Sequence, residues 1–208
     1  MNHFTRRNAL KATGLALCSA MLGGAAGNAM GEETATPPGP NLRPPPVAPE
    51  ESRAAQVKWY QQFGVSPGRR LLAVYGNIYG VSPEIAFKIS GGLSGGLGHT
   101  GEACCTLTAA IMLLGLKHES ENVGRQSDKD AHKKTIALAK QFTDDFREKH
   151  GAVTCRELLQ HDISTPELYA LVSKVEGLWD ICYKSLDTII DLLENKYDIL
   201  NRNKETPS

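Results

Sequence analysis

The sequence lacks the cysteine spacings of the commonest metal and haem sites. None of its five cysteines forms a CxxC pair, which excludes the signatures of zinc ribbons and bacterial ferredoxins. A CxxCH motif is also missing, so we expect no covalently attached c-type haem. Basic and acidic residues are equal in number, with 23 of each, and no basic patch marks nucleic acid as a partner.

Motifs of several enzyme classes are missing as well. The glycine-rich segment GGLSGGLGHTG, residues 91–101, is not a Walker A loop, because Gly98 is followed by His99 rather than by lysine. It follows a predicted helix, whereas a Rossmann fingerprint follows a strand. We find neither a paired-carboxylate nor a Ser-His-Asp arrangement that would indicate a hydrolase. We expect the glycines to let the backbone pass close to the cysteines that follow, and His99 to be a solvated loop residue.

The first 30 residues have the features of an export signal. TRRNALK, residues 5–11, precedes a weakly apolar run without acidic residues, and this run ends in small residues. The segment resembles a twin-arginine signal with cleavage near Ala29, which implies a periplasmic protein. Cleavage would remove Cys18 and three basic residues, leaving 20 basic and 23 acidic residues and a net charge of 20 − 23 = −3. No later run is long enough to cross a bilayer, so we expect no stable membrane anchor.

The remaining chain divides by composition. Residues 31–50 are rich in proline and predict an extended linker, residues 51–200 a helical domain, and residues 201–208 a polar tail. Within the domain, apolar residues recur at spacings of three and four, which predicts an all-α fold, a compact bundle of six to seven helices. Ser82 and Thr165, each followed by proline, are typical of helix starts. The glycine-rich loop should lead into a central cysteine helix, residues 101–116, capped by Thr100.

The mature chain would hold four cysteines, Cys104, Cys105, Cys155 and Cys182. An even number in an oxidising compartment fits structural disulfides, a redox-active thiol pair, or a metal or iron–sulfur centre held by four thiolates. Neighbours on a helix point about 100° apart, so Cys104 and Cys105 should not bond to each other without strain. On the last helix, from about residue 178 to 200, the apolar spacing turns Cys182 inward.

Three blocks of the sequence resemble one family. ISGGLSGGLGHTGEACCTLTAAIMLLGLKH, VTCRELLQHD and the terminal helix with Cys182 resemble the redox-active proteins with the pattern C, CGAxxG, C, C. The resemblance implies a small all-helical bacterial protein, with split-Soret cytochromes as relatives. It places family cysteines at Cys104, Cys155 and Cys182, whereas the first family cysteine falls on Pro67 and Cys105 takes the place of the motif's glycine. Either Cys105 supplies the fourth sulfur, or the centre is lost and Cys105 is a small buried hydrophobe.

These observations predict an exported redox-active protein. The first hypothesis is electron transfer through an iron–sulfur cluster or another metal ion bound by Cys104, Cys105, Cys155 and Cys182. The alternatives are a metal-free thiol–disulfide redox protein, or a non-catalytic binding or scaffold module. We expect a redox partner protein, and the sequence leaves open whether the protein forms a homodimer. The start of the cysteine helix should lower the pKa of Cys104.

Overall fold

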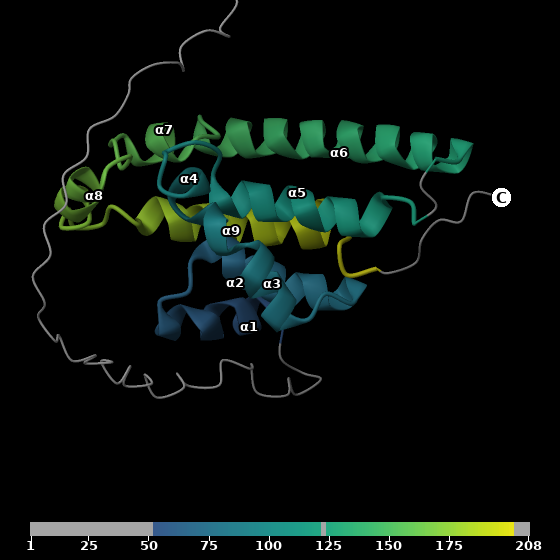
Figure 1. Cartoon of the computed structure of the whole chain (residues 1–208), viewed down its shortest axis with the longest axis horizontal. Helices are drawn as coiled ribbons and strands as arrows, with labels where there is room; N and C mark the ends of the chain where they lie inside the picture. The colour runs from purple at the N-terminus through teal and green to yellow at the C-terminus, as the bar shows by residue number, and fades with distance from the viewer. Residues whose placement is uncertain (1–51, 122–123, 202–208) are drawn as a thin grey trace, which may run out of the picture. The chain divides into compact units, whose positions relative to one another are not determined.

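The computed structural model describes residues 52–121 and 124–201. The predicted export signal, the proline-rich linker and the polar tail from residue 202 lie outside the described residues. The described part is helical throughout, without a β-strand, as Figure 1 shows. The all-α prediction is confirmed.

The described residues contain nine α-helices, joined in places by short turns of 3-10 or π-helix. The expected six to seven helices did not include α4 or α7, which are single short turns in segments that read as loops. In chain order the elements are α1 (Arg53–Trp59), η1 (Tyr60–Phe63), α2 (Pro67–Tyr75), η2 (Gly76–Tyr79), α3 (Pro83–Ile89), η3 (Gly91–Leu93), α4 (Ser94–Leu97), α5 (Cys105–His118), α6 (Gln126–His150), α7 (Cys155–Leu159), α8 (Pro166–Val172), α9 (Asp180–Asp191) and the π-helical η4 (Leu192–Lys196).

Local sequence explains several helix boundaries. The Ser82 hydroxyl accepts a hydrogen bond from the Ile85 amide, and the Thr165 hydroxyl accepts one from the Leu168 amide. Proline occupies the first helical position after each of these residues, where its missing N–H costs nothing. Gly151 ends α6 with a φ of 77°, a left-handed conformation that glycine adopts without strain.

Helix α5 forms the centre of the main core. It packs against α2, α6 and α9, and Figure 1 shows it between α6 on one side and α2 on the other. Its residues are apolar on nearly every side, which suits a helix covered all round. The core is formed by fully buried residues from all four helices, among them Leu71, Leu72, Leu113, Leu114, Phe142, Phe146 and Ile189.

A second, smaller apolar cluster lies where α7, α8 and the start of α9 meet. Its buried members are Cys155, Leu159, Ile163, Val172 and Leu178. Figure 1 shows α7 and α8 at the same end of the helical domain. This cluster brings Cys155 and Cys182 into the same small region, because Cys182 packs against it from α9.

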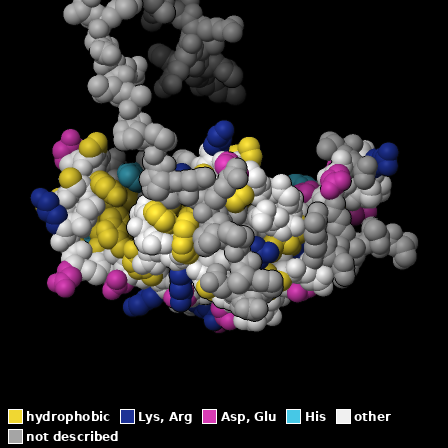
Figure 2. All heavy atoms as spheres, turned by 90° about the horizontal axis from the view of Figure 1, so that it is seen from below, with side chains coloured by type: hydrophobic (Ala, Val, Ile, Leu, Met, Phe, Trp, Pro, Cys, Tyr) yellow, Lys and Arg dark blue, Asp and Glu magenta, His cyan; other side chains and the backbone are white. Residues whose placement is uncertain are grey.

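The described surface mixes charge with hydrophobic side chains. Figure 2 shows both signs of charge interspersed on one face, with hydrophobic atoms gathered toward the end that carries α8 in Figure 1. Leu171 on α8 is 64% exposed. None of the helices in the described residues has the length and apolar character needed to cross a membrane.

Candidate thiol redox site

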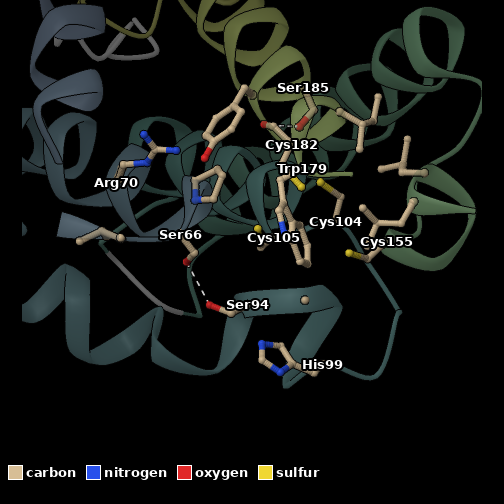
Figure 3. Close-up of a pocket in the computed structure, with 18 of the residues that line it drawn as sticks. Ser66, Arg70, Ser94, His99, Cys104, Cys105, Cys155, Trp179, Cys182 and Ser185 are labelled. Atoms are coloured by element: carbon tan, nitrogen blue, oxygen red, sulfur yellow. Dashed lines mark hydrogen bonds between the residues drawn. The ribbon is translucent and has the colours of Figure 1, made fainter. Parts of the chain in front are cut away.

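All four predicted cysteines line one cavity of about 290 Å³. The cavity lies between the start of α2, the glycine-rich segment, the start of α5, helix α7 and the start of α9. Figure 3 shows Cys104, Cys105, Cys155 and Cys182 entering it from these separate elements. Segments up to 78 positions apart in the sequence (182 − 104 = 78) therefore bring their thiols to one place.

Cys104 and Cys105 differ from the sequence prediction in their backbone. Helix α5 begins at Cys105, and Cys104 is its cap, with a non-helical ψ of 126°. The expected helix start at residue 101 and the cap at Thr100 are wrong, because the Thr100 hydroxyl donates instead to the Gly96 carbonyl at 2.6 Å. Since only one of the two cysteines is helical, the separation of neighbours on a helix does not apply. The Cys105 side chain is the neighbour that most strongly lowers the pKa of Cys104.

A short antiparallel backbone contact places Cys155 beside Cys104. Ala103 pairs with Thr154 in a single bridge, flanked by two backbone hydrogen bonds. The Cys104 amide donates to the Val153 carbonyl at 2.9 Å, and the Cys155 amide donates to the Glu102 carbonyl at 2.6 Å. Side chains alternate between the two faces of an extended pair, so Cys104 and Cys155 emerge on the same face as diagonal neighbours.

The glycine-rich segment passes against this bridge. Gly96 has a φ of 73°, and a β-carbon there would lie 2.6 Å from the Glu102 amide nitrogen and 2.8 Å from the Cys155 β-carbon. Only glycine, which has no β-carbon, lets these two backbone segments approach so closely. The prediction that the glycines permit a close backbone approach to the cysteine site is confirmed.

Cys104 is the acidic thiol of the set. Its pKa falls from 9.0 to about 6, chiefly because the neighbouring Cys105 thiol donates to its sulfur. Burial opposes this shift, whereas the amides of Leu107 and Thr106 at the start of α5 support it. The Thr106 hydroxyl lies 3.6 Å from the Cys104 sulfur and also lowers the pKa. Cys104 is therefore the most readily ionised of the four thiols; the sequence predicted this lowering of the pKa from the helix start, whereas Cys105 is the larger cause.

The other three thiols are held in the protonated form. Donation to Cys104 and burial raise the pKa of Cys105 well above its ordinary value. Burial, followed by the charge of Cys104, raises the pKa of Cys155 to about 11. Burial also raises the pKa of Cys182 to about 12, with smaller effects of Cys155 and Cys104. The shifts thus separate Cys104, whose pKa is lowered, from the three other thiols, whose pKa values are raised.

Cys105 packs against the start of α2. A β-carbon at Gly68 would be 2.3 Å from the Cys105 carbonyl oxygen and 3.2 Å from the Cys105 β-carbon, so α2 and α5 touch here. Cys104 and burial raise the pKa of Cys105, and the Gly68 backbone opposes them. Pro67, on which the resemblance places the family's first cysteine, lines the same cavity. The role of Cys105 as a fourth sulfur ligand stays a prediction.

Sequence reasoning missed several residues of the cavity, among them His99 and Arg70. His99 is not a freely solvated loop residue, because it lines the cavity and stacks on Tyr169, with ring centroids 4.4 Å apart. Arg70 is 1% exposed and also lines the cavity. The only sequence signal for Arg70 is its position four residues before buried Val74, on the same side of α2. An arginine in the segment GRRLL otherwise reads as a surface residue.

The side chains that could bind a metal do not converge on one position in the described residues. Among the His, Cys, Asp and Glu side chains of residues 52–121 and 124–201, no three lie close enough together to hold an ion. Cys104 and Cys105 have local neighbours instead: the Thr106 hydroxyl lies 3.6 Å from the Cys104 sulfur, and Gly68 lies against Cys105. The four thiols share a cavity without forming a coordination shell.

A family model matches residues 69–195, more than half of the chain, and is described as "Putative redox-active protein (C_GCAxxG_C_C)". The chain belongs to this family. The matched segment of this C_GCAxxG_C_C protein contains Cys104, Cys105, Cys155 and Cys182, whereas Pro67 precedes it. No curated protein and no solved structure matches the chain.

Proposed function

We propose that this C_GCAxxG_C_C protein exchanges thiols and disulfides, with Cys104 as the attacking sulfur and Cys155 as the second thiol. The observation that carries the proposal is the single acidic thiol at the start of α5, beside a protonated thiol fixed by a backbone bridge. A thiolate is the nucleophile in disulfide exchange, and a pKa near the ambient pH gives the best attacking thiol. The pKa of Cys104 lies close to that optimum.

The proposed reaction has two steps. The Cys104 thiolate attacks one sulfur of a disulfide RSSR, the S–S bond breaks, and RS⁻ leaves and takes a proton from water. The Cys155 thiol then loses its proton and attacks the Cys104 sulfur, which releases the second RS⁻. Two electrons pass from the protein to the disulfide; one proton comes from the Cys155 thiol and one from water, giving two RSH, a Cys104–Cys155 disulfide and hydroxide.

The electrostatics of the cavity favour this order of events. The negative charge of Cys104 is one cause of the raised pKa of Cys155. When Cys104 enters a mixed disulfide, that charge disappears and the pKa of Cys155 falls. Cys155 therefore ionises more readily in the step that requires it as a nucleophile.

Electron transfer through an iron–sulfur or other metal centre is the second candidate, and the presence of four thiols in one cavity supports it. The residues do not fit that centre in the described arrangement, because no three ligands converge. We therefore derive no step through a metal.

We also propose that the protein acts in the periplasm. Residues 1–30, with their twin-arginine sequence and small residues near Ala29, support this location. Disulfides persist in that compartment, so a thiol pair there has substrates to exchange with. A partner protein or a small-molecule disulfide would serve as the oxidant.

Trapping of the mixed disulfide tests the proposed function. Fully reduced protein is treated with bis(2-hydroxyethyl) disulfide, and the products are counted by intact-mass spectrometry. The wild-type protein should lose two thiols and retain no reagent, whereas Cys155→Ala should retain one 2-mercaptoethanol group on Cys104. Cys104→Ala should react far more slowly, and the matched variant Cys182→Ala should behave as the wild type. Reaction of Cys104→Ala at the wild-type rate would overturn the proposal, and an adduct in Cys182→Ala instead of Cys155→Ala would overturn the role of Cys155.

A further inference from the structure

The cavity contains a buried cation, Arg70, and no carboxylate of the described residues lines the cavity beside it. The Arg70 side chain is 1% exposed, and its Nη1 donates to the Gln61 side-chain oxygen at 3.2 Å. Its Nε has no hydrogen-bond partner among the described residues. The guanidinium carbon lies 5.7 Å from the ring centroid of Tyr183, which covers one face of the group. A buried guanidinium with an unused donor is costly unless a partner supplies the missing charge.

The residues around Arg70 do not supply that charge. No Asp or Glu is found among the described residues that line the cavity. Cys105 and Cys182 lie near Arg70, but both are thiols at neutral pH because their pKa values are raised. Asp187 is outside the lining, and its charge affects Arg70 less than Tyr183 and Cys105 do. Burial remains the largest effect and lowers the pKa of Arg70.

Further polar groups lie beside this guanidinium. Ser66 precedes the nine-residue helix α2, and its hydroxyl does not cap the helix. It accepts a hydrogen bond from the Ser94 hydroxyl at 3.0 Å, which leaves its own proton free to donate. Both serines line the cavity, and Figure 3 shows them joined by this bond. Arg70 and Ser66 therefore each have a donor without a partner among the described residues, which suits an anionic ligand.

The volume of the cavity limits the size of that ligand. About 290 Å³ is at the lower end of the range for small-molecule sites. The walls around the donors are largely apolar and aromatic, including Leu159, Tyr169 and Trp179. Figure 3 shows Arg70 across the cavity from Cys155, with Cys105 and Cys182 between them. A compact molecule could therefore contact the guanidinium at one end and the thiols at the other.

We propose that the cavity binds a small disulfide carrying a carboxylate or another oxyanion, which Arg70 holds while a sulfur of the ligand faces Cys104. This proposal rests on the proposed function, since it names the class of disulfide that Cys104 attacks. The guanidinium fork matches the two oxygens of a carboxylate, and the bond to Gln61 fixes its orientation. The bonds that form and break are those of the exchange described above.

A series of disulfides that differ in charge tests the proposal on the wild-type chain. The probes are dithiodiglycolate, bis(2-hydroxyethyl) disulfide and cystamine, which are anionic, neutral and cationic. Each rate with the protein is divided by the rate of the same probe with free 2-mercaptoethanol, which corrects for intrinsic reactivity. The corrected rate for dithiodiglycolate should exceed that for the neutral probe roughly tenfold, as expected for a hydrogen bond to a charged group, and cystamine should be slowest. Equal corrected rates for all three would overturn the proposal, while reaction of the neutral probe at Cys104 would leave the proposed function intact.

Variants of two neighbouring arginines test whether Arg70 causes the preference for the anionic probe. Arg70→Gln should reduce the preference for dithiodiglycolate to within about twofold of the neutral probe. Arg69→Gln removes the same charge from the adjacent position on α2, which does not line the cavity, and should keep the preference. Circular dichroism checks that both variants are folded. Retention of the preference in folded Arg70→Gln would contradict the proposal.

A binding measurement separates this inference from the proposed function. In Cys104→Ser the attacking thiolate is absent, and calorimetry with dithiodiglycolate reports binding without exchange at that residue. We expect binding that weakens roughly tenfold or more in the double variant with Arg70→Gln. Absence of heat in Cys104→Ser would overturn the anion site even if Cys104 exchanges disulfides normally. If Cys104 of the wild-type protein reacts with no probe but dithiodiglycolate still binds, the anion site stands and the proposed function is rejected.

Discussion

Removal of the Cys105 sulfur should make Cys104 a weaker acid. The Cys105 thiol is the largest influence that lowers the Cys104 pKa to about 6 from its ordinary 9.0. The full shift corresponds to a factor of about a thousand in the ratio of thiolate to thiol. A hydrogen bond to a charged group contributes about 1.5–3 kcal/mol, and 1.36 kcal/mol is equivalent to one pH unit. Cys105→Ala should therefore raise the Cys104 pKa by about one to two pH units.

The assay is alkylation by iodoacetamide across a range of pH, with modification of Cys104 followed by peptide mass spectrometry. In the wild-type protein the rate should be half-maximal near pH 6, because only the thiolate reacts. In Cys105→Ala the midpoint should lie roughly between pH 7 and 8, with little difference from the wild type above pH 9. Cys105→Ser keeps a hydroxyl donor and should keep the midpoint low, and Cys182→Ala leaves the hydrogen bond in place and serves as the control.

Two results would refute this reasoning. If Cys105→Ala titrates at the wild-type midpoint, the neighbouring thiol does not set the pKa, and the start of α5 would have to account for the whole shift. If Cys105→Ser shifts the midpoint as far as Cys105→Ala does, the effect comes from altered packing and not from the donated hydrogen bond.

Three further predictions concern stability. In urea unfolding, Gly68→Ala should lower the free energy of unfolding by about 1–3 kcal/mol, because its β-carbon would lie 2.3 Å from the Cys105 carbonyl oxygen. Gly115→Ala has open space around its β-carbon and should raise the free energy of unfolding by about 0.5–1 kcal/mol. Gly96→Ala forces a left-handed residue against Glu102 and Cys155 and should lower the melting temperature more than Gly98→Ala, whose β-carbon meets nothing. Because the pKa of Cys104 is lower in the fold than in the unfolded chain, its thiolate stabilises the fold above pH 9.0, and this contribution is lost as the pH falls through about 6. Between pH 9 and pH 5 the reduced wild type should lose more unfolding free energy than Cys104→Ala, and equal losses would contradict the lowered pKa.

Features that depend on a few neighbouring residues could be predicted from the sequence. The caps at Ser82 and Thr165 and the end of α6 at Gly151 need only a hydroxyl, a proline or a glycine at the right position. The glycine-rich approach to the cysteines was equally readable, because glycines at that density have few other uses. Each of these features is local, because it depends only on residues a few positions away in the sequence.

Features that depend on distant parts of the chain could not be predicted in this way. The backbone of Cys104 is extended because residues 153–155 pair with it, and no local pattern indicates that bridge. Arg70 is buried because α2 is surrounded by other helices, whereas its own segment is typical of a surface. The four cysteines could therefore be predicted from the sequence, whereas the bridge beside Cys104 and the buried cation in the same cavity could not.

A redox titration of the full set of thiols tests the central claim most directly. Protein is equilibrated in glutathione buffers of increasing potential, its free thiols are counted, and its iron and zinc are measured in the same samples. The account predicts that two of the four thiols in the described residues titrate reversibly in one two-electron step, in metal-free protein, with the disulfide mapped to Cys104 and Cys155. Stoichiometric iron or zinc that protects all four thiols from oxidation would contradict it.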